Sequence, residues 1–75
     1  MIKLPVVSGK ECIKALGDAG FRFKRQEGSH VIMRKDNPFI QVSVPDHKEL
    51  DRGTLRSIIR QVDLSVEEFV KLLGK

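Results

Sequence analysis

Apolar and polar residues alternate in three short segments of the chain, at positions 21–25, 29–35 and 39–44. A two-residue period is typical of β-strands with one buried and one exposed face. Residues that favour turns or end strands follow the segments: Gly28, Asp36-Asn37-Pro38 and Pro45. The pattern predicts three antiparallel strands in one sheet, with an apolar face that helices must cover.

A helical pattern precedes the three segments. Ser8 and Glu11 have the spacing of a capping box, in which each side chain accepts a hydrogen bond from the other residue's backbone amide. The apolar residues that follow recur at helical spacing: Cys12, Ala15, Leu16 and Ala19. Gly20 suits the left-handed conformation that ends many helices. Together these features predict a helix over about residues 8–19.

Two further helical patterns follow the third segment. The first has Asp51 or Thr54 as a possible N-cap and an apolar stripe made of Leu55, Ile58, Ile59 and Val62. The second begins with another capping box, formed by Ser65 and Glu68. The chain is therefore predicted to have an α+β fold with the order helix, three strands, helix, short helix. The helices share one face of the sheet, and the other face is open.

The loop between the first two strands decides which face carries His30. A loop of Glu27 and Gly28 alone places His30 and Arg34 on the apolar face. A loop of residues 26–28, with Gly28 left-handed, separates the apolar side chains from the polar ones. We therefore predict the three-residue loop, with Lys24 beside His30. The core face then carries Phe21, Phe23, Val31 and Met33, and the open face carries Arg22, Lys24, His30, Ile32 and Arg34.

Composition limits the class of protein. The chain has 75 residues, 14 Lys and Arg against 10 Asp and Glu, a net charge of +4 and a pI of about 9.6. We expect one domain over residues 1–75 and an anionic or acidic partner. The single cysteine excludes an internal disulfide and a thiolate-rich zinc site, and we expect no metal or cofactor. The N-terminal apolar run is too short for a signal peptide or membrane span, which favours a soluble, cytoplasmic protein.

The strongest candidate for chemistry is the motif Gly28-Ser29-His30. A histidine can accept and donate a proton near neutral pH, and nearby cations suit a phosphate substrate. We expect His30 to be the catalytic residue. The residues expected to bind RNA are Gly28, Ser29 and three basic ones: Arg22, Lys24 and Arg34. The charge of Lys24 beside His30 would favour the neutral imidazole that a general base needs. RNA is the favoured substrate because its 2′-hydroxyl supplies a nucleophile.

Each candidate residue also has a purely structural interpretation. His30 can be a solvated strand histidine next to a turn. Cys12 lies on the predicted core face, where a buried and inert thiol is expected. His47 follows Asp46 in a loop and is interpreted as a turn residue. The arginines at four-residue spacing, Arg52, Arg56 and Arg60, are interpreted as a solvated helix face.

Several segments together resemble the HicA toxin family. They are Ser8-Gly9-Lys10-Glu11, Leu16 with Gly20-Phe21, Gly28-Ser29-His30-Val31, Val44-Pro45-Asp46-His47 and Gly53-Thr54-Leu55-Arg56-Ser57-Ile58-Ile59-Arg60. Val62-Asp63-Leu64 departs from the Ala-Gly-Leu common in relatives, which is expected to change only the junction between helices.

The resemblance implies a fold similar to the double-stranded RNA-binding domain and an mRNA interferase, an endoribonuclease that is the toxin of a toxin–antitoxin pair. The resemblance also implies that His30 is the catalytic histidine and that a HicB antitoxin binds the toxin and covers this histidine. Two other classes stay open from the residues alone. One is a non-catalytic RNA-binding module of the same fold, and the other is a small adaptor that docks an acidic protein.

Overall fold

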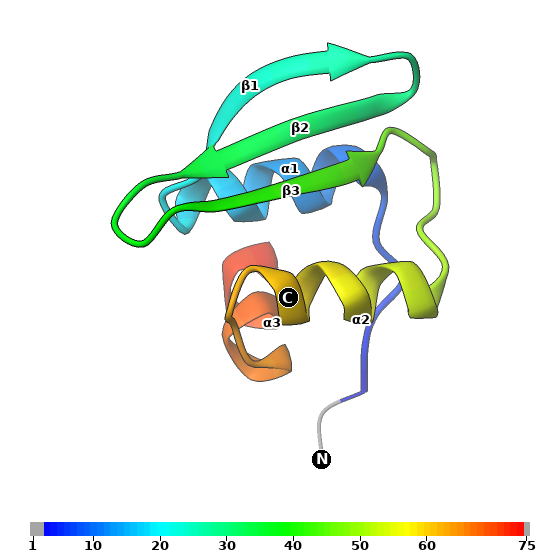
Figure 1. Ribbon diagram of the computed structural model, residues 1–75. Helices are drawn as coiled ribbons and strands as arrows, with labels where there is room; N and C mark the ends of the chain where they lie inside the picture. The colour runs from blue at the N-terminus through cyan, green and yellow to red at the C-terminus, as the bar shows by residue number, and fades with distance from the viewer. Residues whose placement is uncertain (1–2, 75) are drawn as a thin grey trace.

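The computed structural model describes residues 3–74 and has the predicted order of elements. They are α1 (Gly9–Asp18), β1 (Arg22–Glu27), β2 (His30–Lys35), β3 (Ile40–Pro45), α2 (Arg52–Gln61) and α3 (Val66–Leu73). The strands form an antiparallel sheet in the order β1-β2-β3. Helix α1 passes behind the sheet, while α2 and α3 lie below it (Figure 1). The α+β layout resembling a double-stranded RNA-binding domain is confirmed, with one face of the sheet open.

The helices begin where their sequence caps predict. The Ser8 hydroxyl accepts from the Glu11 amide at 3.0 Å, and the Glu11 carboxylate accepts from the Ser8 amide at 3.0 Å. Ser65 and Glu68 repeat this arrangement at α3. Of the two candidate caps of α2, Asp51 is the one used, because its carboxylate accepts from the Thr54 amide and hydroxyl. Each cap satisfies amides that a helix start would otherwise leave without partners.

The core lies between the sheet and the helices. Deeply buried side chains come from several elements, among them Leu16 of α1, Val42 and Val44 of β3, Leu55 and Ile58 of α2, and Phe69 of α3. Phe21 is 4 % exposed, as predicted. Phe23 is 60 % exposed, so its predicted place in the core is wrong. All six residues of β1 are exposed, because this edge strand extends beyond the helices that cover the rest of the sheet.

The predicted three-residue loop is also wrong. Strands β1 and β2 are joined by a two-residue turn, Gly28 and Ser29, and Glu27 pairs with His30. The pairing shifts by one residue between Phe23 and Arg25, which marks a β-bulge at Lys24. Beyond the bulge, Phe23 pairs with Met33 and Arg22 pairs with Arg34. The predicted faces of Arg22 and Phe23 are therefore kept, but the neighbours across the strands differ from the prediction.

The bulge explains why Ile32 is only 7 % exposed although it lies on the open face. A bulge sets two residues of one strand against a single residue of its partner. Lys24 and Arg25 are therefore both opposite Ile32, and Ser43 flanks it on β3. Ile32 is outside the main hydrophobic cluster, so we infer that the stems of its polar neighbours cover it.

Candidate functional site

The turn before β2 fixes the position of His30. Gly28 has φ of +60°, a conformation that glycine adopts at low cost and that suits the first position of a tight hairpin turn. The Ser29 carbonyl accepts from the Asp46 amide at 2.7 Å, which ties the turn to the end of β3. His30 then pairs with Glu27 on β1 and Pro45 on β3. The pairing with both neighbouring strands thus holds the backbone of His30 from both sides, directly after the turn.

The imidazole of His30 is exposed and is anchored through one ring nitrogen. Its Nδ1 lies 3.0 Å from the Ser43 hydroxyl, a hydrogen bond in which either group can be the donor. When Nδ1 donates, Nε2 carries a lone pair and can accept a proton; when the hydroxyl donates, Nε2 carries the proton. The contact therefore orients the ring for proton transfer at Nε2.

An open groove of about 540 Å³ lies between His30 and α2. His30, Ser43 and Pro45 line one wall, and the facing wall is α2 with its cap: Asp51, Gly53, Thr54, Ser57, Ile58 and Gln61. Gln61 donates to the Ser57 hydroxyl at 3.0 Å. Among the described residues that line the groove, Asp51 is the only acidic one, and none is Lys or Arg. The hydrogen bonds from the Thr54 hydroxyl and amide lower the pKa of Asp51, so its carboxylate is charged at neutral pH.

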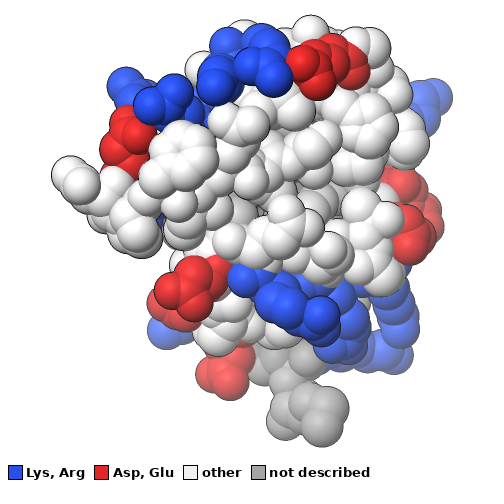
Figure 2. Space-filling view, viewed as in Figure 1, with Lys and Arg blue, Asp and Glu red and all other residues white. Residues whose placement is uncertain are grey.

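The predicted RNA-binding cations lie on the open face, away from this groove. Arg22 and Arg34 share the carboxylate of Asp36, at 2.7 Å and 3.3 Å. Lys24 lies 3.3 Å from the side-chain oxygen of Gln41 and is not opposite His30, so the expected neighbour that would keep the imidazole neutral is missing. Figure 2 shows Lys and Arg gathered over β1 and again over α2, with a largely uncharged band between them.

Two residues near His30 were not among the predicted site residues. Arg25 is on the open face, opposite Ile32, and forms an ion pair of 2.6 Å with Glu27, the cross-strand neighbour of His30. Ser43 is one of the polar residues that alternate with apolar ones in β3. Its contact with His30 depends on the register of β2 and β3, which places Ser43 opposite Ile32 and therefore diagonal to His30.

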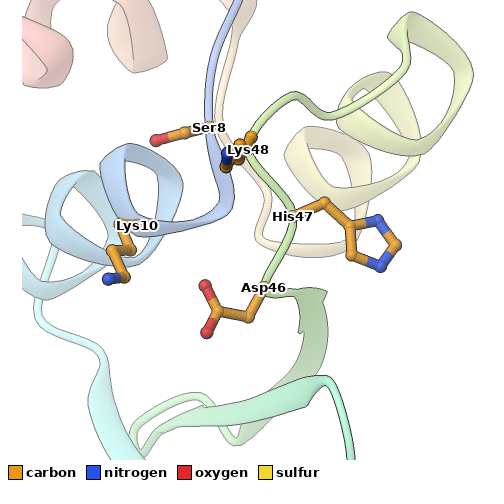
Figure 3. Close-up of a pocket in the computed structure, with 5 residues that line it drawn as sticks. All are labelled: Ser8, Lys10, Asp46, His47 and Lys48. Carbon is orange, nitrogen blue, oxygen red and sulfur yellow. The ribbon is translucent and has the colours of Figure 1, made fainter.

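The other candidates keep their structural interpretations. Cys12 is buried, and burial raises the pKa of its thiol to about 12. His47 lies by a hollow near the start of α1, where the carboxylate of Asp46 points toward Lys10 and the His47 ring points away (Figure 3). The arginines of α2 are exposed: Arg52, Arg56 and Arg60. Within residues 3–74, no group of three or more His, Cys, Asp or Glu is placed to hold a metal ion, and no helix is long and apolar enough to cross a membrane.

Comparison with known families gives a direct match. The family model described as the HicA toxin of bacterial toxin–antitoxin systems matches residues 9–64, from the start of α1 to beyond the end of α2. Comparison with curated proteins finds no significant match. The matched region is more than half of the 75-residue chain and includes the whole sheet, the turn before His30 and both walls of the groove. The chain therefore belongs to the HicA toxin family, whose members are the toxins of toxin–antitoxin pairs.

Proposed function

We propose that this toxin is an endoribonuclease in which His30 transfers the protons of strand cleavage. The observation that carries the proposal is the exposed imidazole on the open face, anchored by Ser43 through Nδ1, at the rim of the groove beside α2. Among the described residues, the open face carries four positively charged side chains: Arg22, Lys24, Arg25 and Arg34. It carries two negatively charged ones, Glu27 and Asp36. Its excess of positive charge attracts the phosphates of RNA.

The chemistry needs one proton-transferring group because RNA supplies its own nucleophile. The lone pair on Nε2 of His30 takes the proton of the 2′-hydroxyl, and the 2′ oxygen attacks the adjacent phosphorus. The bond from phosphorus to the 5′ oxygen breaks, and that oxygen takes up a proton, which the His30 imidazolium holds at this stage. The products are one strand ending in a 2′,3′-cyclic phosphate and one beginning with a 5′-hydroxyl.

The two histidines of the chain allow a matched test. Purified wild type, His30→Ala and His47→Ala proteins are incubated with single-stranded RNA, and the ends of the products are identified. We expect His30→Ala to lower the cleavage rate by a factor of about 10² to 10⁴, and His47→Ala to leave it unchanged. Both side chains are exposed, so neither change should disturb the fold.

The outcomes separate the competing functions. Equal cleavage by wild type and His30→Ala would overturn the catalytic assignment. Retention of RNA by the wild type without cleavage would instead favour the non-catalytic RNA-binding module. A wild type that neither binds nor cleaves RNA would favour the protein adaptor.

Ser43 is proposed as a positioning residue that acts through His30. Without its hydroxyl, the imidazole loses the contact that orients the ring. We expect Ser43→Ala to slow cleavage and to shift the pH profile of the rate without weakening RNA binding. Ser43→Thr keeps the hydroxyl and suits a strand, so it should restore most of the rate. A Ser43→Ala protein with the rate and pH profile of the wild type would refute the assignment.

The partner proposed for the open face is a HicB antitoxin that covers His30. An acidic surface would neutralise the excess cations there and exclude RNA from the same face. Association should slow as salt rises, because salt screens exposed charges. In the complex, the His30 ring should lose solvent contact, as measured by its NMR signals. A complex that leaves His30 exposed and still cleaves RNA at the rate of the free toxin would contradict this mode of inhibition.

A further inference from the structure

We propose that the groove between His30 and α2 binds one unpaired nucleobase of the RNA next to the cleaved bond, and that Gln61 and Ser57 select which base is accepted. This inference rests on the proposed ribonuclease function and adds the determinant of its cleavage-site preference. The groove lies directly beside His30 and Ser43, so its occupant is adjacent to the reacting group.

Charge argues for a base and against a phosphate in this groove. Among the described residues that line it, none is Lys or Arg, and the one charged side chain is the carboxylate of Asp51. That carboxylate repels a phosphate, whereas a nucleobase carries no net charge. Of the cations of the open face, Arg25 is held in an ion pair with Glu27, and the others are farther along the sheet. Arg34, for example, is four residues from His30 on β2, or about 13 Å at the usual rise per strand residue.

The remaining lining has the chemistry that a base needs. Pro45 is half-buried and supplies apolar surface for the flat ring, and Gly53 leaves space because it has no side chain. Gln61 offers both an amide donor and a carbonyl acceptor, and Ser57 offers a hydroxyl. The two side chains are neighbours, because Gln61 donates a hydrogen bond of 3.0 Å to the Ser57 hydroxyl. RNA sequence is usually recognised through such contacts to the edges of unstacked bases.

The helix also separates this pair from its arginines. Gly53, Ser57 and Gln61 follow one another at four-residue spacing along the side of α2 that lines the groove. Arg56 and Arg60 line a different hollow, together with Ile59, Leu64 and Val66. A contact to a phosphate affects all RNA sequences alike, whereas a contact to a base affects the choice of site. Gln61 and its sequence neighbour Arg60 therefore form a matched pair for testing.

The test compares the sites at which a randomised single-stranded RNA is cut. Gln61→Met keeps the length and helix propensity of the side chain but removes its hydrogen-bonding groups; Ser57→Ala removes the hydroxyl. We expect each variant to lower the base preference next to the cut by about fivefold or more. Arg60→Ala should leave the preference unchanged. If Gln61→Met and Ser57→Ala keep the wild-type preference while His30→Ala abolishes cleavage, the inference fails and the proposed function stands.

A second measurement does not depend on cleavage. The side-chain amide signals of Gln61 are followed by NMR as single-stranded DNA hexamers are added to the wild-type protein. The probes are dA, dC, dG and dT homopolymers and an abasic hexamer with the same backbone. We expect at least one base-bearing hexamer to shift the Gln61 signals and the abasic hexamer to leave them in place. An equal shift by the abasic hexamer, or no shift by any probe, would overturn the inference, whether or not the protein cleaves RNA.

Discussion

Gly9, the first residue of α1, lies against the backbone that follows β3. A Cβ atom added at Gly9 would lie 2.3 Å from the Pro45 carbonyl oxygen, 2.9 Å from the Asp46 Cα and 3.0 Å from the His47 nitrogen. The Gly9 amide also donates to the His47 carbonyl at 2.8 Å. All three contacting atoms belong to the backbone, so no side chain can rotate away. The change Gly9→Ala must therefore separate α1 from the end of β3.

The cost follows from the size of this clash. A carbon atom normally lies about 3.3 Å or more from a carbonyl oxygen, so the two segments must move apart by about 1 Å. Such overpacking costs about 1–3 kcal/mol, and the better helix propensity of alanine returns at most about 1 kcal/mol. We expect Gly9→Ala to lower the free energy of unfolding by about 1–2 kcal/mol. Each kcal/mol corresponds to a fall in Tm of about 4–8 °C for a domain of this size.

The control is the same substitution in the same helix. A Cβ at Gly17 would have no atom within 4 Å, and Gly17 is exposed. Gly17→Ala should therefore raise the free energy of unfolding by about 0.5–1 kcal/mol through helix propensity alone. Urea denaturation of the three proteins measures both effects. If Gly9→Ala is as stable as Gly17→Ala, α1 is not packed against β3 as closely as described, and the reasoning is wrong.

Three further predictions use stability or reactivity as the readout. Phe21→Ala should lower the free energy of unfolding by about 3–5 kcal/mol because Phe21 is 4 % exposed. Phe23→Ala should lower it by under about 1 kcal/mol because Phe23 is 60 % exposed. Equal losses of unfolding free energy in urea denaturation would contradict the placement of Phe23. Ser8→Ala and Ser65→Ala should each cost about 1 kcal/mol through the loss of a capping box, again by denaturation. Burial raises the pKa of the Cys12 thiol from an ordinary 9.0 to about 12. As pH rises, the unfolded chain therefore loses the thiol proton at a lower pH than the folded protein does. The free energy of unfolding should consequently fall as pH rises above about 9. Cys12→Ala should lack this part of the alkaline loss, and a thiol reagent should modify the wild type slowly until it is unfolded.

The helices were predictable because their signals are local. A capping box connects residues three positions apart, and an apolar stripe repeats within two turns, so Ser8, Glu11, Ser65 and Glu68 identify helix starts without knowledge of the rest of the fold. The same is true of Gly20, which has φ of +99° after α1. The burial of Cys12 follows from its place in the apolar stripe.

The strand register was not predictable in this way. A three-residue loop without a bulge and a two-residue turn with a bulge give the same faces to Arg22, Phe23, Met33 and Arg34. The apolar pattern on which the prediction relied cannot distinguish them. Lys24 carries no sequence signal for a bulge, because the residue is neither glycine nor followed by one. The exposure of Phe23 likewise depends on how far α1 extends beneath β1, which is a property of the packed molecule.

The candidate site depends on register more than the fold does. The requirement that apolar side chains share one face places His30 on the open face, and the structure shows the histidine exposed there. Its neighbours depend on which residues the strands set opposite each other, and on β1 Glu27 takes the place of the expected Lys24. The contact with Ser43 and the facing wall from α2 join segments that are distant in the sequence. Because the proposed proton transfer and base selection both require such contacts, a motif can indicate a candidate residue, while the packed structure decides what orients that residue and what lies beside it.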